Sequence, residues 1–289
     1  MFNLLPTELV VKIVQQAAWK FVADDRSTVI HLAQTSKMVY QLVAPVLYHT
    51  AVITSRNIVT LYELITSPET AHLAERVGPL VSVLVFMFAE QEDEANRHDV
   101  VLGCFTNVTS FDGAPYFLDY LIYAGNSSIS KLSIYYCHSF AGGISDIPEV
   151  IQRNLTRLVG IISRAEDCVD IPHMLHMLPA LSHIGFDLLE VDEDGGMAVV
   201  QSFNTSAFEQ ILVALHEFKQ LRCITIRVAG SFCHRWAEMQ QVVHRLKDSR
   251  VQMQQDSRER LTWEEENQIS ISDALHGRTM WTEAVALQF

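Results

Sequence analysis

The sequence predicts an α/β protein in which a three-helix module is followed by an irregular solenoid of parallel strands alternating with helices. An apolar motif recurs about every 25 residues from residue 80 onward, and a fixed period of this size indicates a repeat architecture. The segments between its copies carry apolar residues at helical spacing. The first fifty residues lack the motif and show helical patterns with capping residues instead.

The first predicted helix begins near Pro6 and runs through Ile13. Pro6 suits the first turn of a helix, where its missing N–H costs nothing. Glu8 places a negative charge at the positive end of the helix dipole. Leu9, Ile13 and Ala17 follow at helical spacing, so one face of this helix is mostly apolar.

Two further helices complete the module. The second is expected from about Thr28 to Thr35, and Ser36 can cap the third. Pro45 should end the third helix, because the residue before a proline is pushed out of the α region. Three helices of about ten residues cannot bury a self-sufficient core, so the module must pack on a neighbouring domain, a partner chain, or both. The capping candidates of the second helix are Asp24, Asp25 and Ser27.

A strand at residues 51–54 and a helix from Ile58 to Leu73 are expected to connect the module to the solenoid. The repeated motif of the solenoid is Leu-x-x-Leu-x-Leu, matched loosely by apolar residues. Successive copies start 25, 24, 26, 26, 40 and 25 residues apart, and the long gap holds an insertion around Glu190–Ser206. Clear copies start at Leu80, Ile129, Leu181 and Leu221, and weaker copies at Phe105, Leu155 and Leu246.

This signature is that of leucine-rich repeats, in which each unit supplies a short strand and a returning helix. Neither element buries its apolar face alone, so the units stack into a curved solenoid with a parallel sheet. The alternative is a doubly wound α/β domain, whose units usually exceed about 30 residues. A C-terminal segment should cap the last unit, using Leu275, Met280, Trp281, Ala284 and Leu287.

The expected domains are therefore a helical module at 1–50, a connecting strand and helix at 51–78, the solenoid at 79–260 and the cap at 261–289. Within the module, three sequence patterns occur in order: Leu-Pro-x-Glu-Leu-x-x-x-Ile, Leu-Ala-Gln-Thr-Ser-Lys and Ala-Pro-x-Leu-Tyr-x-Thr. Over residues 4–50 this order resembles an F-box of the fungal type. The resemblance implies a module that binds the Skp-type adaptor of SCF ubiquitin ligases. The adaptor contacts that it implies are Leu5, Pro6, Leu9, Ile13, Leu32 and Tyr40.

One departure from the F-box pattern is visible, since many members have a tryptophan in the third helix where this chain has Tyr40. The alternative to an F-box is an ordinary helical cap on the following domain. The chain as a whole carries a formal net charge of −13. That charge argues against nucleic-acid partners, whose binding depends on clustered lysine and arginine, and against membrane surfaces.

The compartment is expected to be the cytoplasm or the nucleus. No run approaches eighteen apolar residues, and the first twenty residues contain Glu8, Lys12 and Lys20, which argues against a signal peptide. Five cysteines without a Cys-x-x-Cys pair suit a reducing environment and free thiols. Four Asn-x-Ser/Thr sequences are then interpreted as turns: Asn107, Asn126, Asn154 and Asn204.

Motifs for catalysis, metal binding or cofactor binding are weak. Cys168, His173 and His176 have only loose metal-ligand spacing. The glycine pairs lack the strand–loop–helix context of a phosphate loop, and no Gly-x-Ser-x-Gly occurs. We therefore expect no enzyme activity, no metal and no cofactor.

The sequence thus predicts the substrate-recognition subunit of an SCF-type ubiquitin ligase, bound through its adaptor to a cullin. An α/β enzyme or ligand-binding protein with purely structural N-terminal helices is the alternative. An unidentified target protein would bind the concave face of the solenoid, with Tyr135 and Arg227 as the main contacts. That face is expected to include Leu84, Ser133, Gly185 and Thr225 as well.

Overall fold

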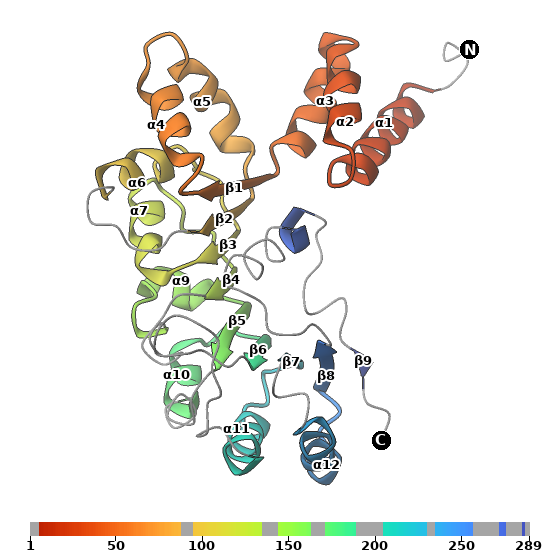
Figure 1. Ribbon diagram of the computed structural model, residues 1–289, viewed down its shortest axis with the longest axis vertical. Coiled ribbons are helices and arrows are strands. Elements are labelled where there is room, and N and C mark those ends of the chain that lie inside the picture. The colour runs from red at the N-terminus through yellow and green to blue at the C-terminus, as the bar shows by residue number, and fades with distance from the viewer. Residues whose placement is uncertain are drawn as a thin grey trace.

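In the computed structural model, which describes residues 6–87, 95–134, 144–162, 171–188, 205–229, 235–256, 272–275 and 285–286, nine strands form one sheet (Figure 1). The first eight strands pair in parallel and lie side by side in chain order. This confirms the predicted parallel order and excludes a doubly wound sheet, whose strand order would be shuffled. The strands are β1 Thr50–Thr54, β2 Val83–Met87, β3 Ser110–Gly113, β4 Lys131–Ile134, β5 Arg157–Ile162, β6 His183–Leu188, β7 Cys223–Ala229, β8 Val251–Asp256 and β9 Val285–Ala286.

Helices alternate with these strands and lie on the outer side of the curved sheet, as expected of a solenoid-like α/β fold (Figure 1). Short 3₁₀ turns at Gly78–Leu80 and Pro115–Phe117 complete the connections. The helices are α4 Ile58–Thr66, α5 Ala71–Val77, α6 Ala95–Leu102, α7 Leu118–Tyr123, α9 Glu149–Asn154, α10 Ile171–Met177, α11 Thr205–Glu217 and α12 Trp236–Leu246.

The N-terminal module consists of α1 Thr7–Phe21, α2 Arg26–Gln34 and α3 Lys37–Leu47. Asp25 caps α2 by accepting a hydrogen bond from the Thr28 backbone N–H at 3.1 Å. Ser36 caps α3 by accepting from the Val39 N–H at 3.2 Å. The prediction that Pro45 ends α3 is wrong, because the helix continues to Leu47. A proline this close to the C-terminus removes only one late hydrogen bond, and the Tyr48 N–H still reaches the Ala44 carbonyl at 3.0 Å.

The module has a small core of its own, distinct from the core between the sheet and its helices. Val14 and Val22 of α1 pack against this small core from its edge. Such a core is close to the lower limit of what can hold three helices together without further contacts. Its buried members are Ala18, Val29, Ala33, Val43, Val46 and Leu47.

The connecting helix predicted from Ile58 to Leu73 is two helices, α4 and α5. Pro68 explains the break, since it forces the preceding residue out of the α region. Ser67 accordingly has an extended backbone, with φ −71° and ψ 128°.

Strand register places one row of apolar side chains, one from each of the strands β2 to β8, in the main core. The clear copies starting at Ile129, Leu181 and Leu221 have the predicted register, as does the weaker copy at Leu155. That row runs through Leu84, Phe111, Leu132, Leu158, Ile184, Ile224 and Val251.

Three copies start later than predicted. The first starts at Val81 rather than Leu80, so Leu84 is fully buried in the core instead of lining the concave face. The other two start at Val108 and Asp248, not at Phe105 and Leu246. The first error has a clear cause: nearly every residue of this segment is apolar, so no alternation indicates which side chains point inward.

Asparagine and hydroxyl side chains tie each repeat to the one before it. Asn107 donates to the Pro79 carbonyl at 2.8 Å, and Asn154 donates to the Ser127 carbonyl at 3.1 Å. Asn126 is buried and donates to the Phe105 and Leu121 carbonyls. Asn107 and Asn126 lie in connections between a helix and the next strand, whereas Asn154 is the last residue of α9, so its interpretation as a turn residue is wrong; Asn204 lies outside the described residues.

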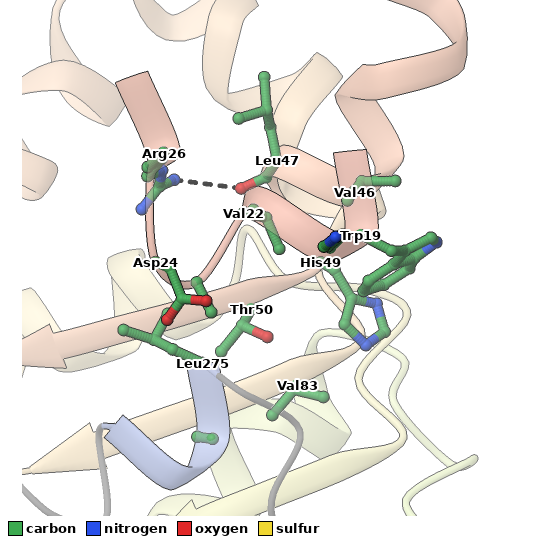
Figure 2. A pocket seen from close by; sticks show the side chains of 13 residues that line it. Trp19, Val22, Asp24, Arg26, Val46, Leu47, His49, Thr50, Val83 and Leu275 are labelled. Carbon is green, nitrogen blue, oxygen red and sulfur yellow. Dashed lines mark hydrogen bonds between the residues drawn. The ribbon is translucent and has the colours of Figure 1, made fainter. Parts of the chain in front are cut away.

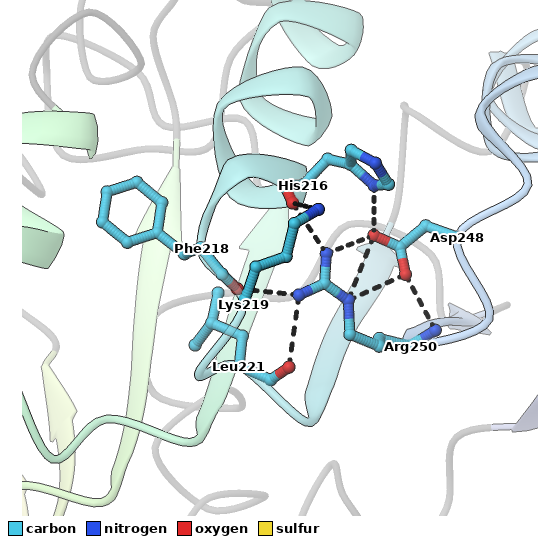
Figure 3. A network of polar contacts seen from close by, with 6 residues as sticks. All are labelled: His216, Phe218, Lys219, Leu221, Asp248 and Arg250. Atoms are coloured by element: carbon cyan, nitrogen blue, oxygen red, sulfur yellow. Dashed lines mark hydrogen bonds and ion pairs between the residues drawn. The ribbon is translucent and has the colours of Figure 1, made fainter.

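In the last parallel repeat, a charged network lies where the other repeats have the first apolar residue of the motif (Figure 3). Asp248 occupies that position and is nearly buried. Arg250 donates to its carboxylate at 2.9 Å and to the Phe218 and Leu221 carbonyls at 2.7 and 3.2 Å. His216 contacts the same carboxylate at 2.9 Å. Arg250 also donates to the His216 carbonyl at 3.2 Å, in the last turn of α11, where a helix leaves its own carbonyls without intrahelical donors.

The C-terminal segment touches both ends of the sheet in the parts that are described. β9 pairs antiparallel with β8, which covers the open edge of the last repeat. Leu275 was predicted to cap that repeat, but it lies beside Thr50 and Val83 at the opposite end. Met280, Trp281, Ala284 and Leu287 lie outside the described residues. None of the helices in the described ranges combines the length and apolar character needed to cross a bilayer.

Candidate functional site

Most of the predicted adaptor contacts are accessible on the N-terminal module. Leu9 and Ile13 are 47% and 48% exposed on α1, and Tyr40 is 36% exposed on α3. Pro6 is exposed at the start of α1. Leu32 differs from them, because it is half-buried against the module core. The sixth residue, Leu5, lies outside the described residues.

Helical geometry explains why Leu9 and Ile13 remain exposed. Val14 and Ala18 direct one face of α1 into the module core. Leu9 and Ile13 are four residues apart, so they are neighbours on a different face. Large apolar side chains exposed in this way are typical of an interaction surface. The sequence prediction missed four further exposed apolar residues of the module, at 51%, 39%, 41% and 49%: Trp19, Phe21, Ile30 and Met38.

A cavity of about 220 Å³ lies where the module meets the first strands of the sheet (Figure 2). Trp19 of α1 contacts His49 edge-to-face, with ring centroids 4.9 Å apart. Arg26 donates to the Leu47 carbonyl at 3.1 Å. Burial and the positive charge of Lys131 lower the pKa of His49 below its usual value. The cavity therefore marks the junction between the module and the first strands of the sheet.

The predicted target contacts on the concave face are less accessible than expected. Tyr135 lies outside the described residues. Arg227 on β7 is nearly buried and pairs with the carboxylate of Asp187 on β6, with a 2.6 Å bond from Nε to Oδ1. Thr225 is fully buried, while Ser133 is half-buried. Target binding at Tyr135 and Arg227 stays a prediction, but the guanidinium of Arg227 is already engaged within the protein.

A second carboxyl group on this face, Asp112 of β3, has an unusual environment. Its Oδ1 is enclosed and has no hydrogen-bond partner. Burial, together with the negative charges of Asp187 and Asp273, raises the pKa of Asp112 to about 8 despite the opposing effect of Arg227. Asp112 is therefore mostly protonated at neutral pH, and Asp273 of the C-terminal segment lies close enough to influence it.

A row of basic side chains on the same side of the sheet was missed by the sequence prediction. Lys131, Arg157 and His183 are the first residues of β4, β5 and β6 and are paired in register. Lys131 is exposed, and the other two are half-buried. A signal for this row was present, since each of the three follows a repeat anchor by two residues: Ile129, Leu155 and Leu181.

Within the described part of the chain, no group of three or more histidine, cysteine, aspartate or glutamate side chains could hold a metal ion. His173 and His176 are exposed on α10, and the ring of His176 lies 5.0 Å from that of Phe218. Cys168 lies outside the described residues. Cys104 and Cys223 are free thiols, and burial raises the pKa of Cys104.

The sequence matches no family model and no curated protein. The assignment of function therefore depends on the two surfaces described above, the exposed apolar face of α1–α3 and the inner side of the sheet.

Proposed function

We propose that this chain is the substrate-recognition subunit of an SCF-type ubiquitin ligase. Its F-box-like module would bind a Skp-type adaptor, and through it a cullin, while its leucine-rich-repeat-like solenoid would bind a target protein. The observation that supports this most is the exposure of Leu9, Ile13 and Tyr40. These residues occupy positions at which the F-box resemblance implies adaptor contacts.

The energetics of the module favour a bound partner. Large apolar side chains at the centre of an interface typically carry most of the binding energy. Burying one such side chain fully contributes roughly 1.5–3 kcal/mol. Leu9 and Ile13 are about half exposed, so each retains part of that contribution for a complex. The small core of the module would gain stability from the same contact.

The solenoid fits the second half of the proposal. Curved parallel sheets with helices on the outer side form extended concave surfaces that bind proteins. A subunit of this kind needs no catalytic residues of its own. It accelerates ubiquitin transfer by holding a target lysine close to the ubiquitin donor.

The test is co-purification of the full chain with a Skp-type adaptor, followed by affinity measurement. The variant Leu9→Ala/Ile13→Ala should weaken adaptor binding by about a hundredfold, if each truncation costs about 1.4 kcal/mol. Leu64→Ala/Leu73→Ala is the matched control, because Leu64 of α4 and Leu73 of α5 are 42% and 45% exposed but lie outside the module. Circular dichroism should show that both variants fold.

Two outcomes would contradict the proposal. The unmodified chain could fail to bind any Skp-type adaptor, or the α1 variant could bind as tightly as the control. Either result would favour the reading in which the N-terminal helices are structural and the chain has another activity.

A further inference from the structure

Residues 272–275 of the C-terminal segment form a short helical turn against the first strands of the sheet (Figure 2). Thr50 of β1 and Val83 of β2 are register partners, and Leu84, which follows Val83, is buried in the main core. Side chains alternate along a strand, so Thr50 and Val83 point to the inner side of the sheet. Leu275 lines the same cavity of about 220 Å³ as these two side chains. The turn therefore lies on the inner side.

The same turn reaches the third strand. Asp112 of β3 follows the core residue Phe111, so its side chain also points to the inner side. Burial raises the pKa of Asp112, and the negative charges of Asp187 and Asp273 raise it further. Val85, the register partner of Asp112 on β2, is 0% exposed although its side chain points away from the helices. This end of the inner side is therefore closed to solvent, and Asp273 lies close to it.

The turn also meets the N-terminal module. Trp19 of α1, Arg26 of α2 and Leu47 of α3 line the cavity together with Leu275 (Figure 2). One turn of the C-terminal segment thus lies where the module meets the inner side of the sheet. A partner that bound the inner side next to the module would contact this turn.

Three features make the turn easy to displace. A single helical turn has little stability of its own, because isolated helices shorter than about 12–15 residues are marginal in water. Each residue of the turn is only half-buried. The cavity beside it shows that its contact with the module is incompletely packed. Elements with few buried apolar contacts open at a low cost in free energy.

We propose that residues 272–275 are an autoinhibitory contact, which occupies the module end of the inner side and must be displaced before a partner protein binds there. The surface accepts a leucine side chain beside Trp19, Thr50 and Val83, as the position of Leu275 shows. A competing partner would therefore present a leucine on a short helical turn. Calling that partner a ubiquitin-ligase target rests on the proposed function, whereas the occupation of the surface by residues 272–275 does not.

The test uses the full chain and a fluorescent peptide with the sequence of residues 268–279, measured by polarisation without adaptor. Leu275→Ser in the chain weakens its own turn, so the surface is free in a larger fraction of the molecules. The peptide should then bind the Leu275→Ser chain at least about tenfold more tightly than it binds the parent. A peptide with serine in place of its leucine should show no such gain.

Two further variants control for surface polarity and for the location of binding. Leu73→Ser on α5 changes a leucine that is 45% exposed and does not line the cavity, and it should bind the peptide as the parent does. Trp19→Ala in the Leu275→Ser chain removes one wall of the cavity and should abolish the gain.

Three binding results would overturn the proposal: equal peptide binding by Leu275→Ser and the parent, an equal gain in Leu73→Ser, or a gain that persists in the Trp19→Ala chain. If thermal unfolding shows that Leu275→Ser does not fold, Leu275→Ala provides the comparison. Unfolding of both variants would also overturn the proposal, because a turn that is required for folding cannot be displaced. Adaptor binding is measured separately, so peptide and adaptor results can fail independently.

Discussion

Arg227 on β7 and Asp187 on β6 form a bidentate ion pair across adjacent strands on the inner side of the sheet. The side chain of Asp187 is 1% exposed and that of Arg227 is 11% exposed. The pair joins residues 40 positions apart, on the two sides of the longest gap between repeats. It fastens those two repeats where the regular spacing is interrupted.

Removing one partner of this pair should destabilise the protein strongly. Arg227→Met leaves the buried Asp187 without its counter-ion, which typically costs about 3–5 kcal/mol. Asp187→Leu/Arg227→Met should recover much of that loss, because no unpaired charge remains. Chemical denaturation measures both. The exposed pair of Arg153 and Glu149 is the control, and Arg153→Met should cost less than about 1 kcal/mol. Equal losses for Arg227→Met and Arg153→Met would contradict the structural role of the buried pair.

The network around Arg250 should behave as a unit. Arg250→Met removes the donors to the Phe218 and Leu221 carbonyls and leaves Asp248 nearly buried without its main partner. A loss of about 3 kcal/mol or more is expected. Asp248→Leu/Arg250→Met restores the apolar residue that the other repeats have at this position and should lose less than the single variant. If the losses in unfolding free energy from Asp248→Leu and Arg250→Met simply add in the double variant, the two residues do not act as a unit.

Asp112 should make stability depend on pH between about 4 and 8. In the folded protein its pKa is raised to about 8 from 3.8, so over this range the folded state holds a proton that the unfolded state has released. The contribution of this group to stability therefore falls as pH rises, by about 1.4 kcal/mol per pH unit, and levels off above pH 8. Asp112→Asn should stabilise the protein more at pH 8 than at pH 5.

Thermal unfolding at the two pH values measures this effect. Asp119→Asn on α7 is the control, because Asp119 is exposed. An Asp112→Asn effect that is the same at both pH values would show that Asp112 does not remain protonated.

Gly78 should tolerate no side chain. A Cβ atom at Gly78 would lie 2.1 Å from the Cys104 carbonyl oxygen, whereas one at Gly103 would lie 3.1 Å from the Asp99 carbonyl oxygen. Gly78→Ala therefore requires a backbone shift, and a loss of about 3 kcal/mol or more is expected. Gly103→Ala should cost clearly less. A reversed order of melting temperatures would show that the backbone at Gly78 can move freely.

Substitutions at Leu32 and Tyr40 should distinguish residues that stabilise the module from residues that only bind the adaptor. Tyr40 is 36% exposed, so Tyr40→Ala should weaken adaptor binding while leaving the module folded. Leu32 packs against the module core, so Leu32→Ala should also increase hydrogen exchange in α1–α3. Identical exchange in the two variants would contradict this division of roles.

The order of elements could be predicted from the sequence because apolar residues recur with a fixed period. Four copies, at Ile129, Leu155, Leu181 and Leu221, have the predicted register. The register failed in the first copy, where the run from Leu80 to Met87 is apolar on both faces. The exposed positions on α1 were also predictable, since Leu9 and Ile13 follow helical spacing.

The polar contacts between repeats were decided only by the tertiary structure. No local pattern links Asp187 to Arg227, or Arg250 to the end of α11, because these partners lie at least 29 residues apart in the chain. The basic row shows the same limit. Its residues occupy one repeat position in the sequence, but only strand pairing in register brings Lys131, Arg157 and His183 onto one face. Periodicity determines which elements form, whereas the sheet determines which distant charges meet.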